Sequence, residues 1–156
     1  MSASPSTPVA IEAPPADDGP IAKFARAVGA LLIVLGALQF VPGVTTNYDE
    51  LEAWGSGAQL FGLFTVSATG AILTMTVGAL CVAFSGSPRQ GHKTVVWTGL
   101  LLITAAIGGA GLVFNSPNPE LPVDDATNWL HLGLGLAILV GSKAAKEKYV
   151  KDKGVL

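Results

Sequence analysis

Hydrophobic positions along this chain gather into four long runs that contain no charged residue. The runs cover residues 27–48, 53–88, 94–119 and 126–142. Helices of soluble proteins average about a dozen residues and carry a polar face, whereas a helix that crosses a bilayer needs roughly 17 to 25 mainly apolar residues. The pattern therefore predicts an all-α integral membrane protein, a bundle of four transmembrane helices.

Breakers and charged residues between the runs set the expected helix limits. The first helix should end at Val41, because Pro42 lacks a backbone donor and Gly43 favours a turn. The fourth helix is the shortest and is near the lower limit for crossing, so we expect Lys143 to extend its side chain toward the headgroups. The expected transmembrane domain covers residues 21–142, with helices at about 23–41, 58–84, 93–114 and 125–142.

The two ends of the chain are polar. Residues 1–20 are rich in Ser, Pro, Ala and acidic residues, which is typical of disorder, so we interpret them as a disordered cytoplasmic tail. Residues 143–156 form a basic cytoplasmic tail. Glu147 stands four residues before Lys151, an order that supports a helix, so the fourth helix could continue into this tail. Its lysines suit anionic phospholipids, and a topology anchor is the alternative explanation.

Lysine and arginine positions predict the orientation, because positively charged short loops stay in the cytoplasm. All nine basic residues fall on one side of a four-span arrangement: Lys23, Arg26, Arg89, Lys93, Lys143, Lys146, Lys148, Lys151 and Lys153. The loops on the other side carry only acidic charge: Asp49, Glu50, Glu52, Glu120, Asp124 and Asp125. The sequence therefore predicts a multi-pass plasma-membrane protein whose N-terminus and C-terminus are both cytoplasmic.

The overall composition agrees with this assignment. Of the 156 residues, 50% are hydrophobic and 13% are charged, against about 25% charged in soluble domains. A net charge of -2 provides no basic surface for nucleic acid, so no nucleic-acid partner is expected. Cys81 is the single cysteine, which excludes an intramolecular disulfide and a CxxC motif.

The predicted membrane interior contains no Asp, Glu, Lys or Arg, although proton relays generally need an ionisable residue there. The two histidines should lie about a bilayer thickness apart, ~30 Å, because His131 is near the outer surface and His92 is in a cytoplasmic loop. This separation excludes a two-histidine haem or metal site within one chain. We therefore expect no cofactor, no metal and no catalytic residue.

One polar cluster, at the start of the fourth helix, could carry chemistry. Asn128 and His131 are three residues apart and share a helix face, with Asp124 and Asp125 just beyond them. A carboxylate could orient the imidazole and make it a general base, a ligand or a pH-sensitive switch. The alternative is structural, a helix cap together with an interhelical hydrogen bond.

Small residues recur four positions apart on three helices, in rows that let membrane helices approach closely. On the fourth helix this row lies about 200° around from His131, so one face could close the bundle and the other could receive a second subunit. The candidate packing residues are Gly70, Thr74 and Gly78, then Ala105 and Gly109, then Gly133, Ala137 and Gly141.

The stretch from Asn128 to Gly141 resembles the fourth-helix signature of a family of small bacterial four-helix membrane proteins, common in actinobacteria. The family is known as domain of unknown function four-three-eight-three. Its second helix carries a motif whose later glycine matches Gly78, and whose opening matches Leu60, Phe61, Gly62, Phe64 and Val66. The resemblance covers the second and fourth helices and implies a membrane protein of four helices.

The polar positions of that second-helix motif differ in this chain. Ser67 stands where the family has Asn, Gly70 and Ala71 replace a His-Asn pair, and Thr74 replaces a second His. Paired-histidine chemistry is therefore not expected here. The resemblance also indicates an internal repeat of two helical hairpins, in which Leu73, Thr74 and Gly78 align with Leu130, His131 and Gly135.

Three functions remain open. The lack of a catalytic constellation, the small size and the small-residue faces favour a non-catalytic accessory or assembly subunit of a larger plasma-membrane complex, with other membrane-protein subunits as partners. Resemblance to actinobacterial proteins implies a respiratory supercomplex as one host. The alternative is a small transporter or channel for an uncharged or weakly polar solute, which requires a polar cavity between the second and fourth helices. A membrane enzyme that uses His131 and Asp125 is the third hypothesis.

Overall fold

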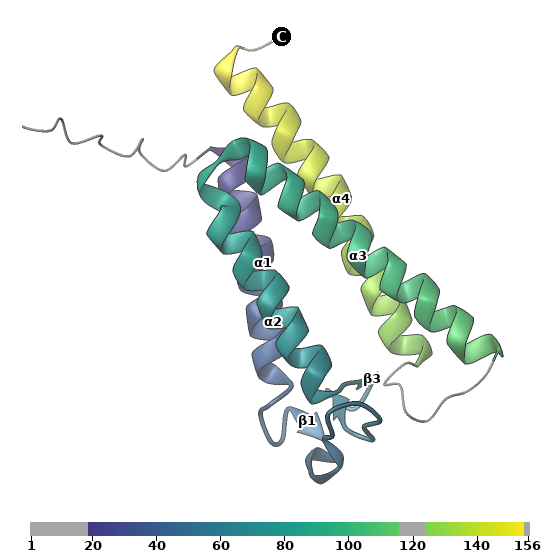
Figure 1. Ribbon diagram of the computed structural model, residues 1–156. Helices are drawn as coiled ribbons and strands as arrows, with labels where there is room; N and C mark the ends of the chain where they lie inside the picture. The colour runs from purple at the N-terminus through teal and green to yellow at the C-terminus, as the bar shows by residue number, and fades with distance from the viewer. Residues whose placement is uncertain (1–18, 116–123, 155–156) are drawn as a thin grey trace, which may run out of the picture.

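Four α-helices form in the part of the chain that the structure, a computed structural model, describes: residues 19–115 and 124–154 (Figure 1). They are α1 (Pro20–Leu38), α2 (Ala68–Ala83), α3 (Pro88–Asn115) and α4 (Asp125–Lys153). Three helical stretches are long and apolar enough to cross a membrane: Pro20–Leu38, Ala68–Gly86 and Pro88–Gly111. The predicted all-α membrane bundle is confirmed. The tail expected over residues 1–20 lies almost wholly outside the described residues.

Local sequence explains where these helices begin and end. Pro20 opens α1, at a position where the missing proline N–H is not needed. The Ser67 side chain caps α2 by accepting a hydrogen bond from the backbone N–H of Gly70 at 3.1 Å. Helix α4 ends at Lys153 and is capped by Gly154, whose φ of +63° suits a residue without a side chain.

The second helix was expected over residues 58–84, and its start was wrong. Residues 58–67 instead contribute to a small antiparallel sheet of order β1-β2-β3, built from β1 (Thr45–Thr46), β2 (Gln59–Leu60) and β3 (Phe64–Thr65). Phe61 and Gly62 turn the chain between β2 and β3 with φ values of 55° and 69°, which a helix does not allow. The apolar residues of this segment fill a core of the sheet, with Ala58, Leu60 and Val66 buried.

Two other helix limits also differ from the sequence-based expectation. Helix α3 begins at Pro88 rather than near residue 93, because the break after α2 is confined to a short 3-10 turn, η2 (Phe84–Gly86). Helix α4 does not stop near residue 142 but continues to Lys153, so the expected basic tail is helical over most of its length. The predicted continuation of the fourth helix is therefore confirmed.

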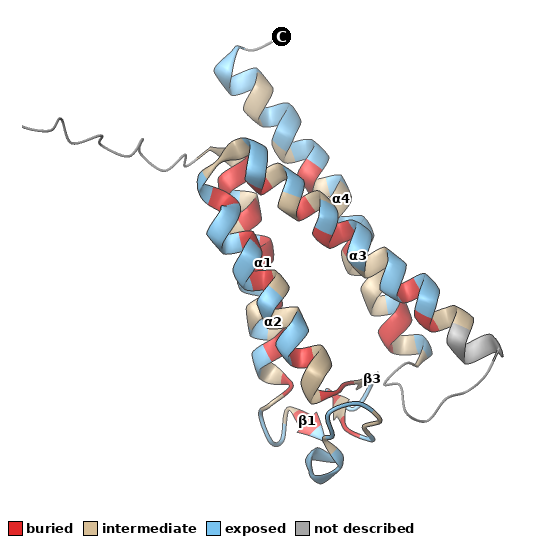
Figure 2. Ribbon diagram, viewed as in Figure 1, coloured by how far each residue is buried: buried red, intermediate tan, exposed pale blue. Residues whose placement is uncertain are grey.

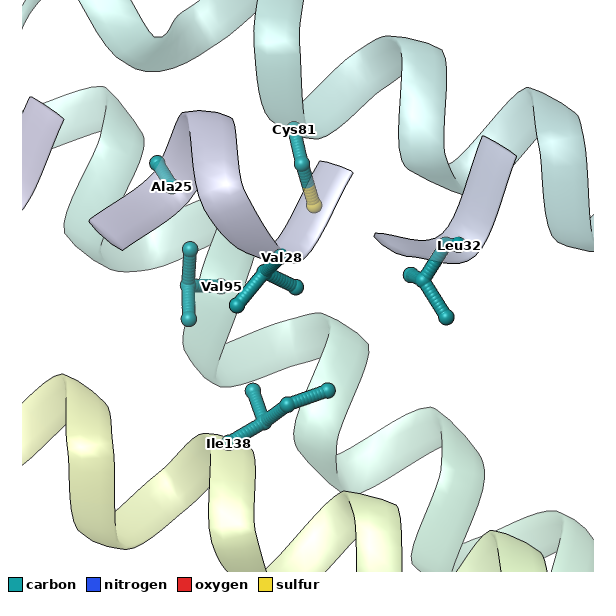
Figure 3. Close-up of a cluster of buried hydrophobic side chains, with 6 residues drawn as sticks. All are labelled: Ala25, Val28, Leu32, Cys81, Val95 and Ile138. Carbon is teal, nitrogen blue, oxygen red and sulfur yellow. The ribbon is translucent and has the colours of Figure 1, made fainter. Parts of the chain in front are cut away.

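The helices pair into two antiparallel hairpins. Helix α1 packs mainly on α2, and α3 mainly on α4, while α1 also contacts both α3 and α4 (Figure 1). Where the hairpins meet, apolar side chains from all four helices form one buried cluster (Figure 3). We call this the central cluster: Ala25, Val28 and Leu32 of α1, Cys81 of α2, Val95 of α3 and Ile138 of α4. Exposed residues cover the outward sides of the helices (Figure 2).

Glycines set the closest approach within each hairpin. A Cβ atom added at Gly29 would lie 2.5 Å from the carbonyl oxygen of Gly78, and one added at Gly78 would lie 2.7 Å from that of Gly29. In the second hairpin, a Cβ on Gly135 would lie 2.8 Å from the carbonyl oxygen of Gly99. Because backbone atoms cannot yield to a side chain, both crossings require glycine.

Charge separates the two ends of the bundle. All lysines and arginines lie where α1 begins, where α2 turns into α3, and where α4 continues; we call this the basic end (Figure 1). The opposite end holds the sheet and is called the sheet end. Described acidic residues of the sheet end are Asp49, Glu50, Glu52, Asp124 and Asp125, while Glu147 and Asp152 belong to the basic end.

Candidate functional site

Asp124 ties the first helix turn of α4 to the sheet. One oxygen of its carboxylate accepts a hydrogen bond from the backbone N–H of Thr127 at 2.6 Å, which caps α4. The other accepts from the backbone N–H of Thr65 at 2.9 Å and from the Thr65 hydroxyl. The Thr127 hydroxyl donates in turn to the carbonyl of Thr65 at 3.2 Å. The helix cap anticipated from the sequence is present, and it also anchors β3.

Hydrogen bonding keeps this carboxylate ionised. Burial by itself raises the pKa of Asp124, but the hydrogen bonds from Thr65 and Thr127 outweigh it, so the pKa is lowered from its usual value. A carboxylate with a low pKa and three hydrogen-bond donors is a structural clamp rather than a proton donor at neutral pH. Asp125, the next residue, is exposed at the surface.

The other two residues of the predicted cluster, His131 and Asn128, lie in different places. His131 lines a cavity between the two hairpins, whereas Asn128 lines a different pocket, between α3 and α4. No hydrogen bond joins His131 to another described residue: the Asp124 carboxylate is bonded to Thr65 and Thr127 and acts on the imidazole only through its charge. The structure therefore does not assemble Asp124, Asp125, Asn128 and His131 into one chemical centre.

The cavity between the hairpins has a volume of about 170 Å³ and is partly open. It lies toward the sheet end, and β2 and β3 cover it there. Apolar side chains form most of its wall: Leu32, Leu35, Leu60, Phe64, Val66, Leu102, Leu130 and Leu134. Its polar members are Gln39, Thr65, Ser67, Thr74, Thr127 and His131, joined by the backbone of Gly70. None of these described lining residues is Asp, Glu, Lys or Arg.

The central cluster closes this cavity toward the basic end. Leu32 belongs to both the cavity wall and the cluster, and Leu102 packs against the cluster. One helix turn beyond the last lining residue of α4, Ile138 is buried in the cluster. The cavity is therefore a recess with one blind end rather than a passage through the bundle.

A second pocket, of about 260 Å³, lies between α3 and α4 near the sheet end. Ala106, Ile107 and Ala110 line it from α3, and Asp125, Asn128, Trp129 and Leu132 from α4. Asn128 is only 6% exposed, and neither its amide nitrogen nor its amide oxygen has a hydrogen-bond partner in the described part of the chain. An unpaired buried amide costs about 1 to 3 kcal/mol, so this position needs an explanation.

The surface around the second pocket consists of exposed apolar residues. Trp129 is 72% exposed and Ile107 66%. A Cβ added at Gly108, Gly111 or Gly133 would meet no atom within 4 Å. We call this surface, with Ala106, Ile107, Asn128, Trp129 and Leu132, the α3–α4 face.

The predicted small-residue rows have several different roles. Gly78 lies at a helix crossing, Gly70 and Thr74 line the cavity, and Gly141 lies against the ring of Phe24, which a Cβ would approach to 2.4 Å. Gly109 is buried, whereas Ala105, Gly133 and Ala137 are exposed. The row on α4 is thus divided, with Gly141 turned to α1 and Gly133 to the outside.

The sequence analysis did not identify the glycines that face these residues across the helix crossings. The predicted packing positions did not include four glycines that lie against the backbone of the neighbouring helix: Gly29, Gly36, Gly99 and Gly135. Only the suggested repeat, which aligned Gly78 with Gly135, contained a usable signal. Metal binding finds no support in the described residues, where no three His, Cys, Asp or Glu side chains are grouped to hold an ion.

Comparison with known proteins gives one match. A family model described as Domain of unknown function (DUF4383) matches residues 23–143, a range that runs from the first turn of α1 into α4 beyond Ser142. No curated protein and no solved structure matches the chain.

Proposed function

The chain belongs to the DUF4383 family, and we propose that it is a non-catalytic accessory or assembly subunit of a larger plasma-membrane complex. An energy-transducing host such as an actinobacterial respiratory supercomplex is part of the same proposal. Its partners are other membrane-protein subunits, which dock on the α3–α4 face.

The observation that carries this proposal is the unpaired amide of Asn128 beneath the α3–α4 face. Polar side chains of membrane helices commonly bond across to a neighbouring helix, and a partner helix could pair this amide in that way. Gly133, one helix turn after Trp129 and open to the outside, lets a partner backbone come close. A helix seated on this face would both pair the amide and cover Trp129.

Substitution at Gly133 tests the docking face without disturbing the fold. Because a Cβ there meets no atom within 4 Å, Gly133→Leu should leave the isolated protein as stable as the original. The same change should remove the partner subunits that co-purify from native membranes in gentle detergent and are identified by mass spectrometry. Ala79→Leu, at an exposed position of α2, is the matched control and should keep the partners.

Two results would contradict the proposal. One is that the original chain migrates alone in every gentle detergent. The other is that Gly133→Leu retains the same partners in the same amounts as Ala79→Leu.

Transport is the second candidate, because a cavity with polar members does lie between α2 and α4, as a transporter requires. Thr74 and His131 contribute to it from the two helices. Against conduction, the central cluster fills the bundle beyond the cavity with apolar side chains. We expect vesicles reconstituted with the protein to swell in glycerol or urea no faster than empty vesicles. Faster swelling that Thr74→Leu abolishes would favour transport.

An enzyme is the least supported candidate. Asp125 lines the second pocket and His131 lines the cavity, so these residues do not form an acid–base pair. If His131 nevertheless served catalysis, His131→Ala would abolish a turnover that the original protein shows.

We also propose that the basic end faces the cytoplasm, which would place anionic phospholipid headgroups beside the lysines of α4. Cys81 is buried and is the single cysteine, so a Cys81→Ala background permits site-specific labelling. A membrane-impermeant thiol reagent should label Glu52→Cys in intact cells and Lys153→Cys only after lysis. The reverse pattern would overturn this orientation.

A further inference from the structure

We propose that the cavity between the two hairpins binds the head group of an uncharged lipid whose head is a single ring bearing a hydroxyl group. The site is separate from the α3–α4 face, and the inference does not depend on the docking of a partner. It follows from the size of the cavity, the charge of its wall and the hydrogen-bonding groups that the wall leaves unused.

The cavity has the volume of one small ring. At about 170 Å³ it is close to the roughly 150 Å³ of an engineered apolar cavity that binds benzene. It is smaller than the roughly 300 Å³ at which pockets for drug-sized molecules begin. The cavity is partly open, which leaves a way out for an acyl or isoprenoid tail attached to the ring.

The wall selects against charge. Among the described residues that line it, none is Asp, Glu, Lys or Arg, and eight of the side chains are Leu, Phe or Val. A phosphate or carboxylate head would lose its hydration without gaining an opposite charge, and the ionised Asp124 carboxylate, bonded to the lining residues Thr65 and Thr127, would repel it. Ordinary phospholipid heads are therefore excluded, and a neutral polar head remains.

The hydrogen-bonding groups of the wall favour a ligand that donates. The Thr74 hydroxyl donates to the carbonyl of Gly70 at 2.8 Å, and that of Thr127 donates to the carbonyl of Thr65 at 3.2 Å. Their protons are committed, but their oxygens can still accept. The Gln39 amide nitrogen bonds the carbonyl of Leu35 at 3.3 Å, which leaves its amide oxygen free to accept as well.

His131 completes the set. A neutral imidazole offers one N–H donor and one nitrogen acceptor, and neither is used by another described residue. A ring hydroxyl can accept from the imidazole N–H and donate to a threonine or amide oxygen, so it satisfies both kinds of group at once. A ring without a hydroxyl would leave these groups unpaired.

Three matched probes test the inference: para-octylphenol, octylbenzene and para-octylanisole. They share ring and tail, but octylbenzene has no polar head and octylanisole accepts without donating. Binding is measured on the full chain in lipid nanodiscs by isothermal titration, relative to empty nanodiscs. We expect octylphenol to bind at least about fivefold tighter than either of the others, the gain from one net hydrogen bond.

Two threonines of α2 provide a matched pair of variants. Thr74 and Thr76 both donate to the carbonyl four residues earlier, at 2.8 Å in each case, but only Thr74 lines the cavity. Thr74→Val should lower the affinity for octylphenol by about fivefold and leave that for octylbenzene unchanged, whereas Thr76→Val should change neither. His131→Leu should act like Thr74→Val, and the threonine pair decides the question if that variant fails to fold.

Three outcomes would overturn the inference. Equal affinity for octylphenol and octylbenzene would show that the cavity is only an apolar recess. Equal affinity for octylphenol and octylanisole would show that no donor is recognised. Equal loss of octylphenol binding in Thr74→Val and Thr76→Val would place the probe outside the cavity.

Discussion

The hairpin of α1 and α2 and the hairpin of α3 and α4 share one construction at their crossings and differ at the sheet end. In the first, Gly78 faces Gly29 and the backbone of Ile33; in the second, Gly135 faces Gly99 and the backbone of Ile103. The predicted repeat therefore extends to the contacts between helices.

Toward the sheet end the two hairpins diverge. In the first, a Cβ on Gly36 would lie 2.8 Å from the carbonyl oxygen of Ala71, so the helices stay in close contact. Along the repeat, Ala71 corresponds to Asn128, which lines an open pocket with Ala106. In the first hairpin the helices fill the space between them, whereas the second leaves an open pocket and an Asn128 amide that no described residue pairs. This difference teaches that the same scaffold can close one pair of helices and leave the other ready for a partner.

The largest effect should come from filling a crossing glycine. Gly135→Val places a branched side chain against the backbone of α3, and overpacking of this kind costs about 1 to 3 kcal/mol or more. Gly78→Val should do the same in the first hairpin. Thermal unfolding in detergent, followed by circular dichroism, measures both, with Gly133→Val as the unaffected control. If only one crossing proved sensitive, the shared construction would be wrong.

The next largest effect should come from removing a helix cap, and its stability cost should differ between the two hairpins. Ser67→Ala removes one capping bond from α2 and should cost about 1 kcal/mol. Asp124→Ala should cost more, since this carboxylate also holds Thr65 of the sheet. The ranking can be read from denaturant unfolding of the two variants. Equal costs would mean that the bonds to Thr65 contribute nothing to stability.

Replacing the unpaired amide should make the second hairpin resemble the first. Asn128→Ala should stabilise the isolated chain by about 1 kcal/mol, because a buried group without a hydrogen bond is removed. The reciprocal Ala71→Asn should destabilise it. A loss of stability in Asn128→Ala, measured by the same thermal unfolding, would mean that the amide is paired within the chain.

The smallest expected effect is a loss of stability at acid pH. Because the folded pKa of Asp124 is lowered, its carboxylate stabilises the fold fully above the unfolded pKa of about 3.9, and this contribution disappears as the pH falls through the folded value. The original chain should therefore lose more stability between about pH 5 and acid pH than Asp124→Asn does. Unfolding temperatures across that range compare the two. If the unfolding temperatures of the two proteins fell in parallel with pH, Asp124 would not be the source of the acid sensitivity.

Residue pattern alone predicts the helical membrane fold, because long uncharged runs have few other solutions. The mistaken start of α2 has a physical cause: residues 58–67 are as apolar as a membrane helix, but turn residues 61 and 62 let them fold back into a sheet core. The cap at Asp124 follows from its residue type. The sequence does not determine whether His131 and Asn128 share a site. Their three-residue spacing leaves them about 60° apart on the helix, and the neighbouring helices decide which pocket each side chain enters.

The clamp between Asp124 and Thr65 has a consequence for assembly. Thr65 belongs to the sheet beside the first hairpin, whereas Asp124 caps α4 of the second. These bonds can therefore form only after α4 has packed against the sheet. A chain truncated before α4 would expose Thr65 and the cavity wall to lipid, and quality-control proteases of the membrane could recognise that unfinished state.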